Sequence, residues 1–253
     1  MVWTRFLAAL LVAGTLAGRA DAADRLFINT GVGAPYVQED RQGFLDLLVG
    51  EVFRRLGHEA EIAFYASAER ALMNADSGVD DGDALRVRGL EAIYPNLIRV
   101  PEKVIDNDFV AYSLRQDVAT TGWDALRPFQ LGFIIGWKIF EANLGQGFQT
   151  TSVQNADQLF TLLAADRADL VLYEEWQGRW IARRRGLPVK VLNPPLLSTE
   201  MFMYLNRKHA ALVEPAAAAL RAMKADGTYD AIARRTLVPL LAENGAGSGG
   251  TAP

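Results

Sequence analysis

The fold is decided by the stretch LFINTGVGAPYVQEDRQGFLDLLVGEVFRRLG, residues 26–57. Its first five residues have the apolar composition of a buried strand, and the Gly- and Pro-containing residues 31–36 predict a loop. Residues 43–57 place apolar side chains at the i, i+3, i+4, i+7 spacing of an amphipathic helix, which Gly57 is placed to end. The apolar positions of that helix are Leu45, Leu48, Val49, Val52, Phe53 and Leu56.

The same alternation continues along the chain. Residues 61–65 predict a second strand, and residues 68–74 predict a short helix with Ser67 as its N-cap. Alternating strands and helices are typical of an α/β fold, in which helices cover a sheet. We therefore expect the first part of the chain to form one α/β unit.

A second α/β unit is predicted to begin near Gln130. Asn155, with Gln158 three residues later, resembles a capping box that opens a helix. Gly186 is placed to end a later helix of the unit. The predicted strands are 131–135, 169–173 and 189–192, and the predicted helices are 137–144, one that Asn155 opens, and 174–185.

Two similar segments flank the second unit. Residues 109–115 and 201–207 are apolar runs that end in polar or basic residues, and they predict strands by which the chain crosses over and returns. Residues 211–237 are predicted to be helical, with Pro215 in a first turn, where its missing N–H does no harm. The expected organisation is a first lobe of residues 24–110 plus 207–240, a second lobe of residues 115–200, and a disordered Gly-, Ser- and Ala-rich tail at 243–253.

The N-terminus has the pattern of a secretory signal peptide. Arg5 precedes a short apolar run, residues 6–18, and Ala20-Asp21-Ala22 offers a small-x-small cleavage site. A membrane anchor is the alternative, but a span needs about 20 apolar residues. We expect cleavage after Ala22 and a periplasmic protein. Because no Cys follows the run, no cysteine-linked lipid is expected.

Composition excludes several classes of protein. The chain has 253 residues, no Cys, two His and a net charge of −4, so it has no disulfide or thiol nucleophile, and a histidine-rich metal site is not expected. The densest positive run, Arg183-Arg184-Arg185, lies at the end of a predicted helix, where the helix dipole favours cations. Nucleic acid is therefore not an expected partner, and no cofactor is expected.

The order of these segments resembles the periplasmic solute-binding proteins of family 3, the amino-acid-binding type. The resemblance covers residues 24–240 and implies a two-lobed type II periplasmic binding protein fold, a hinge of two crossing segments, and a monomer that delivers ligand to an inner-membrane ABC transporter permease. It rests on GFLDLLVGEVFRRLG (43–57), DSGVDDGDALRVRGLEAIYPNLIRVPEKV (76–104), LGFIIGWKIFEANL (131–144), LLAADRADLVLYEEW (162–176) and LRAMKADGTYDAIARR (220–235).

The resemblance implies ligand contacts at acidic and basic positions. Arg86 corresponds to an arginine that grips a ligand carboxylate; Arg88 competes for this role, and an ion pair with Asp83 or Glu91 is the structural alternative. As a cleft residue, Arg86 is expected to support little core packing. Glu174 stands where amino-acid binders have an Asp for the ammonium group, and its alternative is an acid at a helix N-terminus.

Further contacts are implied in both lobes. Gly136, Trp137 and Lys138 stand where the family has Gly followed by Thr or Ser, so backbone N–H groups could still hold an anion although the side chains depart from the pattern. Tyr36 is expected to place its ring over the ligand or to pack on the crossing segments. Arg70 is a weaker candidate, with a surface role as its alternative.

Three functions remain open at this level. The first is capture of a small polar or charged solute, amino-acid-like or an organic acid, by hinge closure, without chemistry. The same fold could also serve as a ligand-sensing protein that feeds a sensor kinase. The second is a periplasmic enzyme, for which Glu174 is the obvious acid–base group. The third is an interaction protein that needs no charged cleft.

Overall fold

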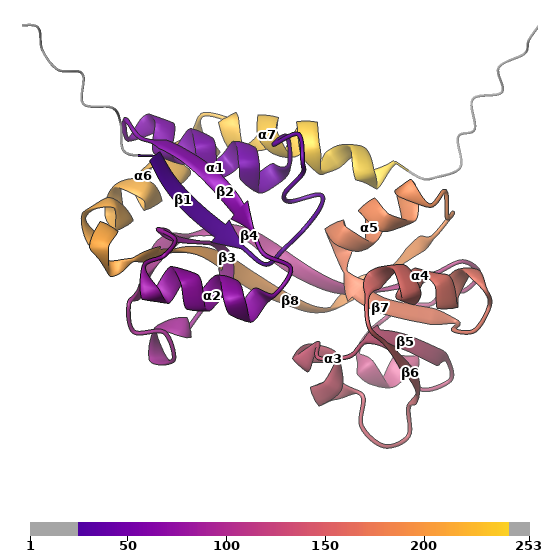
Figure 1. The fold of residues 1–253 in the computed structure, drawn as a ribbon. Coiled ribbons are helices and arrows are strands. Elements are labelled where there is room, and N and C mark those ends of the chain that lie inside the picture. The colour runs from indigo at the N-terminus through magenta and orange to yellow at the C-terminus, as the bar shows by residue number, and fades with distance from the viewer. Residues whose placement is uncertain (1–24, 243–253) are drawn as a thin grey trace, which may run out of the picture.

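The computed structural model describes residues 25–242, which form a mixed α/β fold with two lobes (Figure 1). The predicted signal peptide and the predicted tail lie outside the described residues. The strands are β1 (Arg25–Thr30), β2 (Glu59–Phe64), β3 (Gly82–Val87), β4 (Leu97–Ser113), β5 (Gln130–Ile134), β6 (Gln149–Val153), β7 (Leu170–Glu174) and β8 (Lys190–Asn206). The helices are α1 (Phe44–Arg55), α2 (Ala68–Ser77), α3 (Lys138–Asn143), α4 (Ala156–Ala164), α5 (Glu175–Arg184), α6 (Val213–Ala225) and α7 (Thr228–Thr236).

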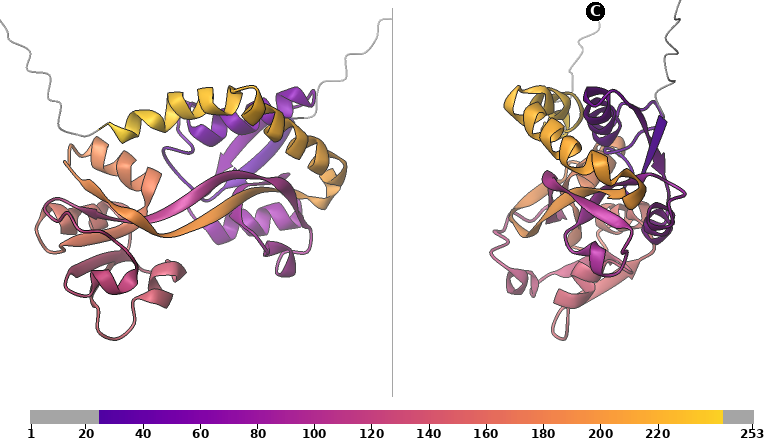
Figure 2. Two further views of the ribbon diagram at one scale, coloured as in Figure 1. Left: turned by 180° about the vertical axis from the view of Figure 1, so that it is seen from behind. Right: turned by 90° about the vertical axis from the view of Figure 1, so that its left-hand side faces the viewer.

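Two long strands join the lobes. Within the described chain, one sheet has the order β2-β1-β3-β8-β4-β7-β5-β6, and β4 and β8 at its centre are 17 residues long each. They pair antiparallel, from Leu97 opposite Asn206 to Ser113 opposite Lys190, and run through both lobes (Figure 2). The crossing segments predicted at 109–115 and 201–207 are the ends of these strands.

The predicted separate strand at 189–192 is wrong, because it is the start of β8. Residues 193–196 of β8 have no partner in β4: Phe109 lies opposite Leu197, and Ala111 lies opposite Leu192. This bulge contains Pro194 and Pro195, which have no N–H to donate to a ladder. The two prolines therefore interrupt the pairing but do not end the strand.

The strand directions bring the carboxyl ends of two parallel sets to one junction. β4 leads from the first lobe into the second, and β7 runs antiparallel to it, back toward the first lobe. β8 returns to the first lobe, and β3 runs antiparallel to it, toward the second lobe. Because β1 and β2 are parallel to β3, and β5 and β6 are parallel to β7, all six strands end at the junction of the lobes.

Each lobe has its own buried core. In the first lobe, α1 and α6 bury one face of the sheet and α2 covers the other, where Ala75 packs with Phe202 and Tyr204 (Figure 1). In the second lobe, one cluster lies under α4 and α5 and another lies on the α3 side, around Phe140. The exact lobe boundaries given above stay predictions.

Local signals in the sequence place most helix ends. The Ser67 side chain caps α2 by accepting from the Arg70 N–H, and Asn155 caps α4 by accepting from the Gln158 N–H. Pro215 lies in the first turn of α6. Residues 211–237 are largely helical, as predicted, and Gly227, with a left-handed φ of 81°, separates α6 from α7.

Two helix glycines should respond in opposite directions to alanine. At Gly178 in α5, a Cβ would overlap the buried ring of Tyr112, so Gly178→Ala should destabilise the protein by about 1–3 kcal/mol. At Gly50 in α1 a Cβ meets nothing within 4 Å, so Gly50→Ala should stabilise it by about 0.4–1 kcal/mol. Urea unfolding of both variants checks the pair; a stabilised Gly178→Ala protein would contradict the packing described.

Candidate functional site

The first lobe presents Arg86 near the carboxyl end of β3. Its Nε donates to Asp83 Oδ2 at 2.7 Å, and its Nη2 donates to the Ala68 carbonyl at the start of α2 at 2.9 Å. Asp83 is fully buried and also accepts from the Leu85 N–H. Burial raises the pKa of Asp83, although the positive charge of Arg86 opposes this shift. Arg86 therefore compensates a buried acid, which is the ion pair with Asp83 that the sequence left open.

The other two arginines of this lobe are placed differently. Arg88 is exposed, pairs with Glu200 at 2.6 Å, and lies over the Phe202 ring at 5.1 Å from its centroid. Arg70 lies on α2 with its guanidinium 6.0 Å from the centroid of the Tyr65 ring, directly after β2. Within residues 25–242 the guanidinium of Arg70 makes no ion pair.

The second lobe contributes the turn between β5 and α3. Gly136 has a left-handed φ of 86°, and its N–H donates to Glu141 Oε1 at 2.7 Å. The Lys138 ammonium pairs with Glu141 Oε2, also at 2.7 Å, and this hydrogen bond lowers the pKa of Glu141. The protein's own carboxylate thus occupies the two donors that an anionic ligand would use here.

Trp137 belongs to the core of the second lobe. Its ring stacks on Phe140 at a centroid distance of 5.8 Å with 7° between the planes, and it lies 4.7 Å from the Tyr173 ring. Phe109 meets it edge-on at 6.1 Å. These contacts hold the turn at Gly136 in place and leave the Trp137 ring partly buried.

Tyr36 and Glu174 are brought together although 138 positions separate them. The Tyr36 hydroxyl donates to Glu174 Oε1 at 2.9 Å and lies 3.2 Å from Asn107 Oδ1. Glu174 also caps α5 by accepting from the N–H groups of Trp176 and Gln177. Burial raises the pKa of Glu174 to about 7, although these three donors favour the carboxylate.

A pocket of about 760 Å³ is lined by residues of both lobes. The first lobe lines it with the loop at 33–41 and with Phe64 at the end of β2, and the second lobe lines it with Trp180 and Arg184 of α5. Small-molecule sites typically measure about 300–1,000 Å³, so the pocket has a suitable size, but none of the residues predicted to contact ligand is among its lining residues.

Three residues at the site were missed in the sequence. Asn107 lies in a polar run inside a strand, which carries no signal for its long-range contact. Glu141 follows Lys138 by three positions, and this spacing does predict an ion pair on a helix. Trp180 lies on α5 and contributes to the pocket, but helical periodicity alone does not distinguish a pocket residue from a core residue.

Within residues 25–242, no three His, Asp or Glu side chains are grouped as a metal site would require. Within the same residues, no helix has the length and apolar composition needed to span a membrane.

Comparison with known proteins identifies the fold. No protein-family model matches the chain. The ligand-binding core of GluR0 from Nostoc punctiforme, in complex with L-glutamate, superimposes with a TM-score of 0.66 at 16% identity, over 83% of this chain and 98% of that one. The chain has the two-lobed fold of periplasmic binding proteins. The fold implied by the resemblance in the sequence is therefore confirmed.

Other similar structures belong to proteins of different kinds. The second substrate-binding domain of a putative amino-acid ABC transporter from Streptococcus pneumoniae gives a TM-score of 0.67 at 16% identity, over 84% of this chain and 99% of that one. A histidine kinase sensor domain with similarity to periplasmic binding proteins gives 0.68 at 17% identity, over 86% and 97%. An uncharacterized protein of Shewanella oneidensis is 25% identical over 174 residues, 64% of each chain. The chain thus spans less than two thirds of the length of the curated relative it matches.

Proposed function

We propose that this protein binds a small polar or charged solute between its lobes, closes around it, and performs no chemistry on it. The observation that carries the proposal is the convergence of two parallel strand sets, β1 to β3 and β5 to β7, on one junction bridged by β4 and β8. Ligands of open α/β sheets bind outside the carboxyl ends of the strands. The similar ligand-binding core of GluR0, solved in complex with L-glutamate, supports an amino-acid-like ligand.

The ligand contacts follow from the charges at the junction. On the first lobe, Arg70 supplies positive charge, while the charge of Arg86 is compensated by Asp83. On the second lobe, the turn at 136–138 supplies Lys138 and part of the Trp137 ring. Because Glu141 already engages Gly136 and Lys138, a ligand carboxylate has to displace it or bind at Arg70. This arrangement favours a ligand whose charged groups are bound mainly by the first lobe.

An enzyme on this fold is the weaker alternative. A general acid or base must reach the group with which it exchanges a proton. Glu174, the acid considered for that role, is 1% exposed and holds donors of the protein on both of its oxygens. This arrangement supports binding over catalysis.

The setting that fits this binding role is the periplasm, with export directed by residues 1–22 and with delivery to an inner-membrane ABC transporter by a monomer. The similarity to a histidine kinase sensor domain favours a second candidate, in which the ligand state is passed to a sensor kinase. The two candidates share the binding step and differ only in the partner of the closed form.

A thermal-shift screen of amino acids, polyamines, organic acids and sugars tests the proposal. A ligand at 100 times its Kd adds about 2.7 kcal/mol of stability. For a chain of this size that corresponds to a rise in Tm of roughly 5–10 °C. X-ray scattering with a compound that scores should show a smaller radius of gyration. Conversion of the compound to a product, or an unchanged radius with bound compound, would contradict a binding protein that closes.

A further inference from the structure

Three polar side chains from three separate segments meet where the lobes join. Tyr36 comes from the loop after β1, Asn107 from β4, and Glu174 from the end of β7. Tyr36 is 0% exposed and Glu174 is 1% exposed. It is costly to leave either partner of a buried hydrogen bond unpaired. The contact therefore constrains the segments that carry it.

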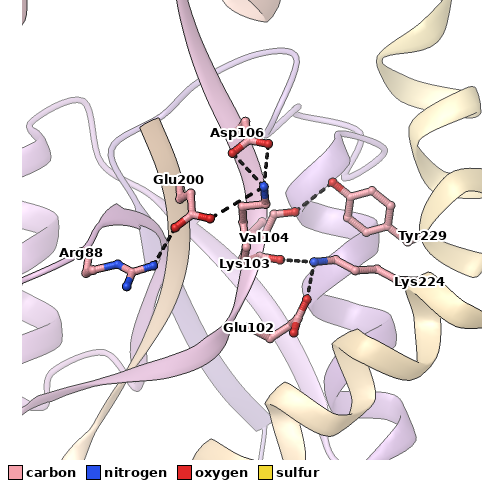
Figure 3. A network of polar contacts seen from close by, with 8 residues as sticks. All are labelled: Arg88, Glu102, Lys103, Val104, Asp106, Glu200, Lys224 and Tyr229. Carbon is pink, nitrogen blue, oxygen red and sulfur yellow. Dashed lines mark hydrogen bonds and ion pairs between the residues drawn. The ribbon is translucent and has the colours of Figure 1, made fainter. Parts of the chain in front are cut away.

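The segment with Asn107 lies between two anchored parts of β4, and there residues 105–109 pair in regular register with residues 197–201 of β8. In the first lobe, the Tyr229 hydroxyl donates to the Val104 carbonyl at 2.8 Å, and Lys224 bonds Glu102 and the Lys103 carbonyl (Figure 3). From Phe109 onward, β4 pairs with β7 of the second lobe, beginning with Phe109 opposite Glu174.

The pairing of β4 with β8 is irregular on both sides of this segment. The register shifts between Lys103 and Ile105 and again between Phe109 and Ala111. Within this stretch, Lys103 pairs with Asp106 at 2.7 Å (Figure 3). Residues 105–108 and their partners 198–201 of β8 are therefore the two-stranded stretch in which the chain passes from one lobe to the other, and bending of both strands there would move the lobes relative to each other.

Tyr36 and Glu174 are each fixed to one of these bodies. The Tyr36 backbone is held by its N–H bond to Gly33 and by the Leu45 N–H, and its ring lies 6.2 Å from the Phe44 ring. Glu174 is fixed by the first N–H groups of α5. The phenol–carboxyl contact is thus a rigid link between lobes at the point where the chain bends.

We infer that Tyr36 and Glu174 are positioning residues that pin the two lobes together at Asn107 and so set the angle from which the lobes close. This inference rests on the proposed function in one respect, because it takes the motion of the lobes to be closure around a ligand. It assigns both residues to the hinge and not to contact with the ligand, because the oxygens of Glu174 already accept from groups of the protein.

The strength of the pin should depend on pH. Burial raises the pKa of Glu174 to about 7, so near neutral pH the carboxylate and the neutral acid are both populated. Other titratable and charged groups lie around the contact between Tyr36 and Glu174. They are Asp106, Asp108, Tyr112, Tyr173, Glu175, Arg179 and Tyr229. Burial raises the pKa values of Tyr36, Tyr112, Tyr173 and Tyr229, so these side chains stay neutral near pH 7.

Inter-lobe distances measured without ligand test the pin. Because the chain has no Cys, Val79→Cys and Ala164→Cys place one spin label on each lobe at exposed positions. In this background Tyr36→Phe, which removes only the hydroxyl, should broaden the distance distribution and shift its mean. The width for the parent protein should change between pH 6 and pH 8, and Glu174→Gln should abolish that change.

Tyr112→Phe is the matched control. Tyr112 is also fully buried, and its hydroxyl donates to the backbone carbonyls of Glu174 and Glu175, within the second lobe. Tyr112→Phe should therefore leave the distribution of inter-lobe distances unchanged. An effect of Tyr112→Phe as large as that of Tyr36→Phe, or no effect of Tyr36→Phe at pH 8, would overturn the pin. If Tyr36→Phe does not fold, Glu174→Gln decides, since an unchanged pH response in that variant also overturns it. Because no ligand is present, failure of the pin is distinct from failure of the binding function.

Discussion

Replacing Arg86 by alanine is expected to destabilise the protein by about 3–5 kcal/mol, the usual cost of removing one partner of a buried ion pair. Asp83 is fully buried, and the side chain of Arg86 is only 12% exposed. The Asp83 carboxyl would keep only the Leu85 N–H as a donor. Its buried charge would then be uncompensated. Urea unfolding at pH 7 measures the loss.

Two further variants make the Arg86 experiment decisive. Arg88→Ala removes an exposed partner of Glu200 and should cost about 0–1 kcal/mol. Asp83→Asn combined with Arg86→Ala removes the buried charge as well, so it should recover part of the loss. If Arg86→Ala stays within 1 kcal/mol of the parent protein, the Asp83 pair is not the compensation described.

The structural role of Arg86 also affects what a loss of ligand binding in Arg86→Ala would mean. The sequence suggested that a cleft arginine supports little packing, but Arg86 also bonds the Ala68 carbonyl and so joins β3 to α2. A loss of ligand affinity in Arg86→Ala would therefore combine a lost contact with a disturbed first lobe. Arg70, which makes no ion pair within residues 25–242, is the cleaner test of a ligand carboxylate.

Local patterns in the sequence predict the elements whose cause is local. The apolar spacing of residues 43–57 corresponds to α1, and the caps at Ser67 and Asn155 lie where helices begin. β6 was missed because its sequence, QTTSV, is polar and largely exposed and so has no apolar alternation. The length of β8 was missed because Pro194 and Pro195 resemble a strand end.

The candidate site depends on long-range contacts, which the sequence expresses only in part. The pair of Asp83 and Arg86 spans three positions and was open to prediction, whereas the contact of Tyr36 with Glu174 depends on how two lobes meet. The resemblance to a known family selected both residues but gave them ligand roles, which stay predictions. Burial and hydrogen bonding favour a structural role for Glu174, and this role has a measurable consequence.

The stability of the protein is expected to fall by about 3 kcal/mol between pH 4.5 and pH 7 because of Glu174. The pKa of Glu174 is about 7 in the folded protein, against an ordinary value of 4.5. In this window the folded state keeps a proton that the unfolded chain releases, so stability decreases as pH rises and stays low above pH 7. A shift of this size, at 1.36 kcal/mol per pH unit, gives about 3 kcal/mol.

Glu174→Gln isolates this contribution because its side chain is neutral at every pH. It should unfold near the same urea concentration as the parent protein at pH 4.5 and be more stable at pH 8, by up to about 3 kcal/mol, less whatever hydrogen bonding the amide loses. Tyr36→Phe should move the window to higher pH, because the Tyr36 hydroxyl favours the carboxylate. Urea unfolding from pH 4.5 to pH 8, followed for each lobe, provides the comparison. Parallel pH profiles for the parent protein and Glu174→Gln would show that Glu174 is ionised in the folded state throughout, and that its three donors outweigh its burial.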